Sequence, residues 1–327
     1  MHTRRTFITT SGAAAMVVTA PMAFAQGEAY PNRPIRFYAG FPPGGVADIV
    51  ARIITPGLSA RLGQPVIVDN RAGAGGVIGV DSVAKSRADG YTMGFGVSGA
   101  LTSSVTLMPK LPYDPTKDIA PVSLVVSNPL LLAVPADSGI QNISGFIAAA
   151  KAAQGKFNYG TAGAGTAMNL AGELLKQRAG IEMTHIAYKG SSPAAMDLLG
   201  GQLSAAVLDL ATAKPHILSG RFKALGLTSG KRTALAPEIP TIQEAGVPGY
   251  EFDSWFGLVM PAATPPAILA RVHTELVAVL RDPGVRQQLM DAGTDPAPGT
   301  PEEMAGQIRK EIDLTARLIK TANIKIE

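Results

Sequence analysis

The first residues of this chain that could do chemistry lie in a glycine-rich loop, Gly40–Gly45, which reads G-F-P-P-G-G. The apolar segment before it, Ile35–Ala39, predicts a short buried strand, and apolar residues recur at helical spacing from Val46 onward. Gly45 can serve as the N-cap of that helix, which places Asp48 at its third position. The first amides of a helix have no partner inside the helix, so this strand, loop and helix predict an anion-binding site.

Within this loop, Phe41, Gly44 and Gly45 are the candidate ligand contacts. The two glycines have no Cβ, so a ligand could approach their backbone closely. The same spacing is also compatible with an ordinary turn between a strand and a helix. A short glycine motif does not decide between the two interpretations.

A second loop of this kind, Thr161–Thr166, reads T-A-G-A-G-T. It follows a strand predicted over Phe157–Gly160 and precedes a helix predicted over Met168–Arg178. Bare amides and two hydroxyl groups at the start of that helix again suit an anion. The candidate ligand contacts in this loop are Thr161, Gly163 and Thr166.

Three further polar side chains lie at the end of a predicted strand or just after one: Ser98, Asp209 and Lys189. Lys189 could contact a carboxylate, but a solvated loop lysine is the favoured interpretation, because most lysines are exposed. Asp209 could accept a hydrogen bond from a ligand amine or hydroxyl group.

Ser98 raises the alternative of a secreted serine hydrolase, which would need a base and an orienting acid. The surrounding sequence, Gly96–Ala100, lacks the G-x-S-x-G pattern, and the partners of His185, His216 and His273 cannot be inferred from the sequence. No two histidines have the spacing of metal ligands, so we expect no metal site and no catalytic group.

The elements that must position these residues alternate between strands and helices, which predicts an α/β protein with doubly wound, mainly parallel sheets. The chain has 327 residues, of which 46% are hydrophobic and 17% charged, enough for two packed domains. Pro56 is expected to kink the first helix or to end it near Thr55. Three later helices are expected to begin with a capping residue followed by proline, at Thr264-Pro265, Asp282-Pro283 and Thr300-Pro301.

The N-terminus has the pattern of a secretory signal peptide over residues 1–25. Arg4 and Arg5 precede an uncharged segment that ends in Ala23-Phe24-Ala25, an A-x-A cleavage sequence. The arginine pair fits either twin-arginine or Sec export. The chain has no cysteine, which excludes disulfides and a lipid anchor on an N-terminal cysteine. We therefore expect a periplasmic protein that is soluble, and a net charge of only +4 gives no reason to expect nucleic-acid binding.

Several of these segments together resemble the Bug family, the TctC-like solute-binding proteins of tripartite tricarboxylate transporters. The resemblance rests on the segment from Pro34-Ile35-Arg36 through Arg52, on the runs that begin at Gln64-Pro65 and Leu111-Pro112, and on Glu238–Tyr250. It implies a two-domain periplasmic binding protein-like fold with a hinge and an inter-domain cleft. It also implies capture of a small carboxylate for delivery to the transmembrane permease subunits, by a monomer without a cofactor.

Three features of this chain depart from the family pattern. Val46 and Ala47 stand where a hydroxyl residue often follows the glycine pair, and Asn169 stands where a histidine is common. Asp209 lies one position after the usual aspartate, which aligns with Leu208. We place the crossings between domains at 127/128 and 253/254. The expected first domain is then 26–127 together with 254–327, and the second is 128–253. Trp255 and Phe256 are expected to pack at the hinge, away from the ligand.

Overall fold

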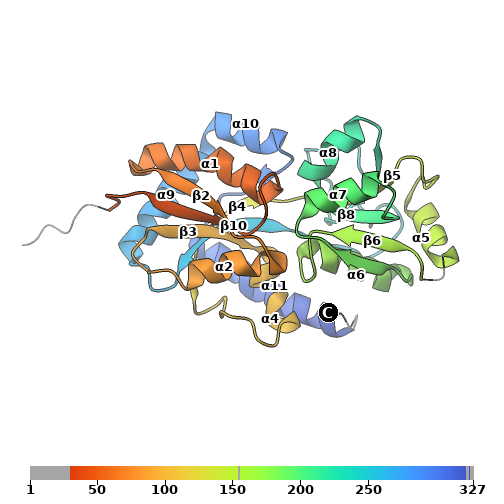
Figure 1. The fold of residues 1–327 in the computed structure, drawn as a ribbon, viewed down its shortest axis with the longest axis horizontal. Helices are drawn as coiled ribbons and strands as arrows, with labels where there is room; N and C mark the ends of the chain where they lie inside the picture. The colour runs from red at the N-terminus through yellow and green to blue at the C-terminus, as the bar shows by residue number, and fades with distance from the viewer. Residues whose placement is uncertain (1–29, 154, 322–323, 325–327) are drawn as a thin grey trace, which may run out of the picture.

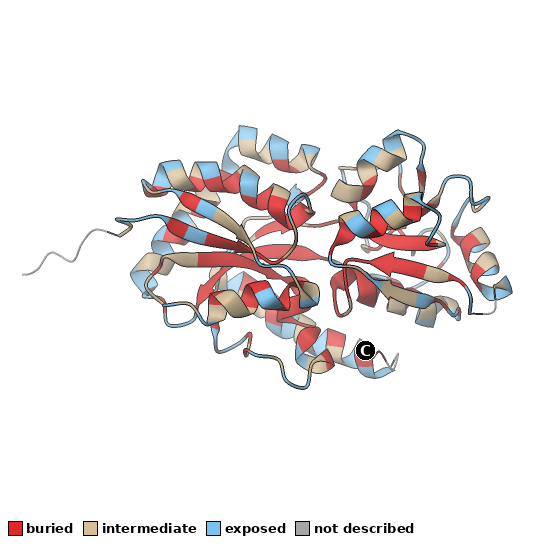
Figure 2. Ribbon diagram, in the orientation of Figure 1, coloured by how far each residue is buried: buried red, intermediate tan, exposed pale blue. Residues whose placement is uncertain are grey.

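The computed structural model describes residues 30–153, 155–321 and 324, and the predicted signal peptide lies outside this part of the chain. The described residues form two sheets with helices on both faces, joined side by side (Figure 1). Figure 2 shows buried residues along both sheets and exposed residues on the outer faces of the helices. This arrangement is the expected two-domain α/β architecture.

The first sheet has, within the described residues, six strands in the order β11-β4-β10-β3-β1-β2. Its strands are β1 (Ile35–Ala39), β2 (Val66–Asn70), β3 (Thr92–Val97), β4 (Ile119–Ser127), β10 (Trp255–Pro261) and β11 (Asp295–Pro296). The helices of this lobe are α1 (Val46–Leu62), α2 (Val77–Ala84), α3 (Ser98–Leu101), α4 (Ser104–Leu107), α9 (Pro266–Arg281), α10 (Pro283–Asp291) and α11 (Pro301–Thr321), with a 3₁₀ turn, η1 (Ala74–Gly76). In Figure 1, α1 and α10 lie on one side of this sheet and α2 and α11 on the other.

The second sheet has five strands in the described part of the chain, in the order β7-β6-β8-β5-β9. Its strands are β5 (Leu130–Pro135), β6 (Asn158–Thr161), β7 (Thr184–Ala187), β8 (Ala205–Asp209) and β9 (Phe222–Leu227). Its helices are α5 (Ile143–Ala152), α6 (Ala167–Ala179), α7 (Ser191–Leu199) and α8 (Leu210–Leu218). Two apolar clusters form on this sheet, one with residues of α5 and α6 and the other with residues of α7 and α8.

Both sheets are mixed, which corrects the expectation of mainly parallel pairing. β1 pairs in parallel with β2 and β3, and β6 pairs in parallel with β7 and β8. In contrast, β10 runs antiparallel to β3 and β4, and β5 runs antiparallel to β8 and β9. The reason is topological. The chain leaves the first sheet along β4 and returns along β10, so these neighbours must run in opposite directions.

The two crossings between the sheets lie next to each other. The amide of Asn128, just after β4, donates to the carbonyl oxygen of Ser254, just before β10, at 2.8 Å. Trp255 Nε1 donates to Glu311 Oε1 at 2.8 Å, which fixes the start of β10 to α11. Burial raises the pKa of the Glu311 carboxyl group above its ordinary value, although hydrogen bonds from Gln307 and Trp255 oppose the effect. Within the described residues, the chain passes from one sheet to the other only at these two crossings, between β4 and β5 and between β9 and β10.

Most element predictions agree with the structure, and two need correction. β1 has the predicted bounds, Asp282 caps α10, and Thr300 forms a capping box with Glu303. Thr264 does not cap α9. A second proline, Pro266, takes the first helical position, which makes Pro265 the N-cap and moves Thr264 outside the helix.

Pro56 does not end α1, which continues to Leu62. A proline inside a helix removes one backbone hydrogen bond. The apolar face of α1 continues past Pro56 with Leu58 and Leu62, which are buried in the core of the first lobe. Burial of two leucines outweighs the loss of that hydrogen bond.

We expect the exposed Pro56 to lower the stability of the protein, because proline costs about 3 kcal/mol relative to alanine inside a helix. Part of this is recovered because proline also restricts the unfolded chain. Pro56→Ala should therefore raise the free energy of unfolding by about 1 to 3 kcal/mol, measured by chemical denaturation. Leu58→Ala is the control in the opposite direction and should lower it by about 2 to 5 kcal/mol. An unchanged free energy of unfolding in Pro56→Ala would contradict this prediction and would show that the proline causes no strain in α1.

Candidate ligand-binding site

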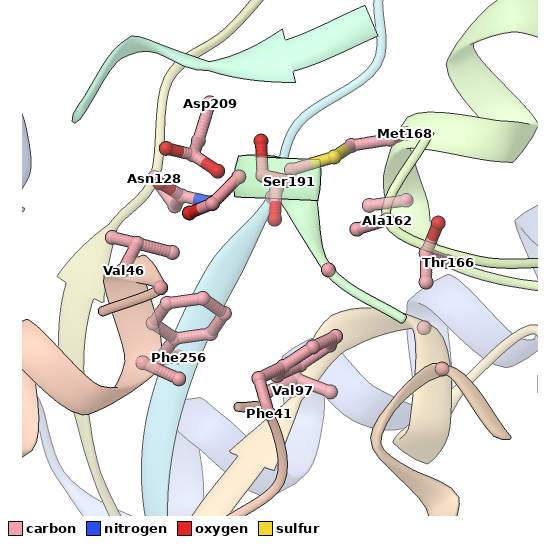
Figure 3. A pocket seen from close by; sticks show the side chains of 18 of the residues that line it. Phe41, Val46, Val97, Asn128, Ala162, Thr166, Met168, Ser191, Asp209 and Phe256 are labelled. Carbon is pink, nitrogen blue, oxygen red and sulfur yellow. The ribbon is translucent and has the colours of Figure 1, made fainter. Parts of the chain in front are cut away.

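A cavity of about 70 Å³ lies between the two lobes. Its walls come from the loops that follow the strands of both sheets and from both crossings (Figure 3). Loops at the carboxyl ends of strands are where open α/β sheets bind ligands. The first lobe and the crossings contribute Phe41, Pro42, Pro43, Gly45, Val46, Ala47, Gly75, Val97, Ser98, Gly99, Asn128, Ser254 and Phe256. The second lobe contributes Ala162, Thr166, Ala167, Met168, Gly190, Ser191, Ser192, Pro193 and Asp209.

Five helices of the described chain have their N-cap residue in the wall of this cavity, among them the short α3, after Val97, and α8, after Asp209. α1 begins after Gly45, α6 after Thr166 and α7 after Gly190, and each of these N-cap residues lines the cavity. The first amides of each helix have no partner within it, and the helix dipole makes that end positive. No lysine, arginine or histidine is among the described residues that line the cavity. Among the described lining residues, the groups that suit an anion are therefore backbone amides and not cationic side chains.

The first loop is held in place by Asp48, at the third position of α1. Asp48 Oδ2 accepts a hydrogen bond from the amide of Gly44 at 3.0 Å, and Oδ1 accepts from Arg52 Nε at 2.9 Å and from Asn70 Nδ2 at 3.1 Å. Burial alone would raise the pKa of this carboxyl group, but these hydrogen bonds lower it below its ordinary value. Asn70 Nδ2 also donates to the carbonyl oxygen of Phe41 at 3.0 Å. The loop is thus preorganised before any ligand binds.

The second loop is held by its own hydroxyl groups. Thr166 Oγ1 donates to the carbonyl oxygen of Gly163 at 2.7 Å and accepts from the amide of Asn169 at 3.3 Å. Thr161 Oγ1 lies 2.7 Å from His185 Nε2. Burial lowers the pKa of His185 to about 4, so its ring is neutral at pH 7 and adds no positive charge.

The structure divides the residues predicted from the sequence into two groups. Those that line the cavity are Phe41, Gly45, Ser98, Thr166 and Asp209. Those that do not line it are Gly44, Thr161, Gly163 and Lys189.

Each residue of the second group has a physical reason for its position outside the cavity wall. The amide of Gly44 is already bonded to Asp48, and its φ of +80° turns the chain in an exposed position. Thr161 and Gly163 hold the loop in position: Thr161 contacts His185, and the carbonyl oxygen of Gly163 accepts a hydrogen bond from Thr166. Lys189 is exposed to solvent, while the next residue, Gly190, reaches the cavity.

Several lining residues were not predicted, among them Asn128, Met168, Ser191 and Phe256. Asn128 lies in the first crossing between the sheets. Its role could have been predicted from that position, because a crossing borders any space between two lobes. Phe256 was expected to pack at the hinge away from the ligand, yet it lines the cavity. It is the second residue of β10, so it lies beside the crossing and faces the space between the lobes.

The lobes touch each other closely around the cavity. Ser103 Oγ, which belongs to the first lobe, lies 2.7 Å from the carbonyl oxygen of Gly165 in the second. A Cβ placed on Gly99 would lie 2.8 Å from that same oxygen, and one on Gly75 would lie 3.0 Å from the carbonyl oxygen of Ala164. Side chains at these two glycines would force the lobes apart. The glycines therefore permit the contact that encloses the cavity.

The arrangement does not supply the groups for hydrolysis by Ser98. None of the histidines predicted as possible bases, His185, His216 and His273, lines the cavity with it. His185 contacts Thr161, and His273 Nε2 lies 3.0 Å from the carbonyl oxygen of Gly299. Among the described residues, no group of three or more histidine, cysteine, aspartate or glutamate residues is placed to hold a metal. No helix in this part of the chain is both long and apolar enough to span a membrane.

Comparison with known proteins places the chain in a family. Residues 50–324 match the profile of a family described as the tripartite tricarboxylate transporter family receptor. BugT of Bordetella pertussis is 37% identical over 322 residues, which cover 98% of this chain and 96% of that protein.

Two solved structures are similar over nearly their whole length. An R. palustris protein solved with adipate is 34% identical, with a TM-score of 0.87, and the match covers 90% of this chain and 99% of that one. MatC from Rhodopseudomonas palustris with bound malate is 31% identical, with a TM-score of 0.84, and the match covers 89% and 100%. From the profile match and the identity with BugT, we conclude that this chain belongs to the TctC, or Bug, family of tripartite tricarboxylate transporter receptors.

Proposed function

We propose that this protein is an extracytoplasmic solute-binding protein that captures a small carboxylate between its lobes and delivers it to a tripartite tricarboxylate-type permease. The observation that carries this proposal is the convergence of the α1, α6 and α7 N-termini on one cavity between the lobes. Unpaired amides at a positive helix end bind carboxylates and phosphates well.

The two solved relatives support a carboxylate as the class of ligand, because their structures contain adipate and malate. Both of those ligands carry two carboxylate groups. The apolar wall formed by residues such as Phe41, Val97, Met168 and Phe256 suits the hydrocarbon part of a ligand. Dicarboxylates, tricarboxylates, amino acids and aromatic carboxylates remain candidates at this level of the proposal.

The transport role places the mature protein in the periplasm, exported by a signal peptide over residues 1–25. We propose lobes of residues 26–127 with 254–327, and of residues 128–253, and the membership of the strands in the two sheets supports this division. The ligand-bound protein would act as a monomer and without catalysis, since a receptor needs only to close on its ligand and release it to the permease. The residues that we assign to the ligand are Phe41, Gly45, Ser98, Thr166 and Asp209 from the predicted set, together with the unpredicted lining residues.

The ligand class can be tested by thermal denaturation of the protein with a panel of small carboxylates and, as controls, neutral sugars. A ligand that binds only the native state at 100 times its Kd adds about 2.7 kcal/mol to the free energy of unfolding. This corresponds to a rise in Tm of several degrees for a protein of this size. We expect at least one carboxylate to produce it. If sugars raise Tm and no carboxylate does, the proposed ligand class is wrong.

The contribution of the α1 amides can be tested at Val46, the first helical residue. Val46→Pro removes the amide hydrogen while proline remains compatible with the first position of a helix. The extended conformation of Gly45, with φ −80° and ψ 165°, also tolerates a following proline. Val46→Ala is the matched control, because it shortens the side chain and keeps the amide.

Calorimetry with a carboxylate identified in the thermal screen should show a Kd roughly tenfold or more higher for Val46→Pro than for Val46→Ala. A hydrogen bond to a charged group contributes about 1.5 to 3 kcal/mol. Circular dichroism should show both variants folded. Equal affinities in the two variants would mean that the α1 amides do not hold the carboxylate.

A further inference from the structure

Three side-chain oxygens in the cavity wall are buried without a hydrogen-bond partner in the described part of the chain. They are Asn128 Oδ1, Ser191 Oγ and Asp209 Oδ2. The three residues are 2%, 5% and 0% exposed, so bulk water does not satisfy them. Buried polar groups in native proteins are nearly always hydrogen-bonded. Unsatisfied atoms that converge on one cavity therefore indicate what a ligand must supply.

Their positions in the fold bring them to one end of the cavity. The amide of Leu210 donates to the carbonyl oxygen of Pro129 at 2.8 Å, so Asp209 lies beside the crossing that contains Asn128. α7, which begins with Ser191, packs against β8, which ends with Asp209. Figure 3 shows the three side chains grouped together, apart from Phe41 and Val97.

Asp209 already has one structural task and one free oxygen. It is the N-cap of α8, and its Oδ1 accepts a hydrogen bond from the amide of Thr212 at 2.7 Å. Oδ2 has no such partner. A plain anion bound beside this carboxylate would meet a like charge in a buried site, where repulsion is strong. A ligand that places a hydrogen-bond donor at Asp209 avoids this repulsion and satisfies Oδ2.

The number of free acceptors distinguishes the possible donors. A hydroxyl group donates one hydrogen bond, whereas a protonated amine donates three and carries a positive charge. One ammonium group could satisfy Asp209 Oδ2, Asn128 Oδ1 and Ser191 Oγ together. The α1 N-terminus lies in the same wall at Val46, so a neighbouring carboxylate of the same ligand would meet unpaired amides.

We propose that the ligand of this protein is an amino acid, that is, a carboxylate that also bears a protonated amine, and that Asp209, Asn128 and Ser191 bind the amine. This inference rests on the proposed function, because it specifies which of the carboxylates the same site selects. Asp209 is then the residue that determines specificity, and the apolar remainder of the wall holds the side chain of the ligand.

The test is calorimetry with two sets of acids that share a carbon skeleton and differ at one position. The first set is succinate, malate and aspartate. The second is 4-methylpentanoate, 2-hydroxy-4-methylpentanoate and leucine. In at least one set, the amino member should bind at least tenfold more tightly than the hydroxy member and the unsubstituted member.

The inference is overturned if the hydroxy or unsubstituted member binds as tightly as the amino member in every set that binds. It is also overturned, in a distinguishable way, if other carboxylates of the wider panel bind and no amino acid does. If no carboxylate of any kind binds, the proposed function itself is wrong.

Asp209→Asn isolates the role of the charge. Asparagine keeps an oxygen that can accept from the amide of Thr212, so the cap of α8 is preserved. The variant should bind the amino acid at least tenfold more weakly and the unsubstituted acid with unchanged or higher affinity. A merely structural defect would weaken both ligands equally. Unchanged affinity for the amino acid would contradict the inference, and if the variant does not fold, the two ligand sets decide.

Asp282→Asn is the matched control. Asp282 also caps a helix, α10, by accepting from the amides of Gly284 and Val285, and it does not line the cavity. It should leave the preference for the amino acid unchanged. A change of preference in this variant would show that the loss of a helix cap, and not the charge at position 209, alters the specificity.

Discussion

The site of this protein depends on the backbone amides that every helix leaves unpaired at its start. A buried anion must be given partners, and a chain can supply them with cationic side chains or with the positive ends of helices. Here α1, α6 and α7 all begin in the cavity wall, and the described lining has no basic residue. Much of the architecture follows from this choice, because helix starts can converge only if the strands that precede them end at the same place.

The support behind each helix start shows how this geometry is maintained. In the first lobe, Asp48 receives hydrogen bonds from Gly44, Arg52 and Asn70 and so fixes the loop before α1. In the second lobe, Thr166 caps α6 and also bonds back to Gly163. These polar side chains hold the backbone in position, while the backbone faces the ligand. A site built in this way is preorganised, which reduces the cost of ordering it on binding.

The contact between the lobes adds a second constraint. The paired crossings at Asn128 and Ser254 keep the lobes together, and Gly75 and Gly99 let the two backbones approach closely. Polar groups buried in the cavity wall are shielded from bulk water, which strengthens the electrostatic interactions that they make. The same burial makes the unpaired oxygen of Asp209 costly in the absence of a donor. The cavity wall therefore combines helix starts, which suit an anion, with a buried carboxylate oxygen, which suits a hydrogen-bond donor.

The sequence by itself determined the local structure and the family. Strand, loop and helix around Gly40–Gly45 follow from apolar spacing and glycine, and the caps of α10 and α11 follow from Asp282-Pro283 and Thr300-Pro301. Such features depend on residues close in sequence, so periodicity and capping chemistry suffice to predict them. Motifs spread over the whole chain identified the family for the same reason.

Tertiary structure decided the features that depend on contacts between residues far apart in the sequence. Gly44 and Gly45 are adjacent, but only Gly45 lines the cavity, because Asp48 occupies the amide of Gly44. Helix α1 continues past Pro56 because Leu58 and Leu62, which follow the proline, are buried in the core. The antiparallel pairing of β4 with β10 arises from the return of the chain to the first sheet. Asn128, Ser191 and Asp209 come from three separate segments, so their convergence depends on the packing of both lobes and has no signature in any single stretch of sequence.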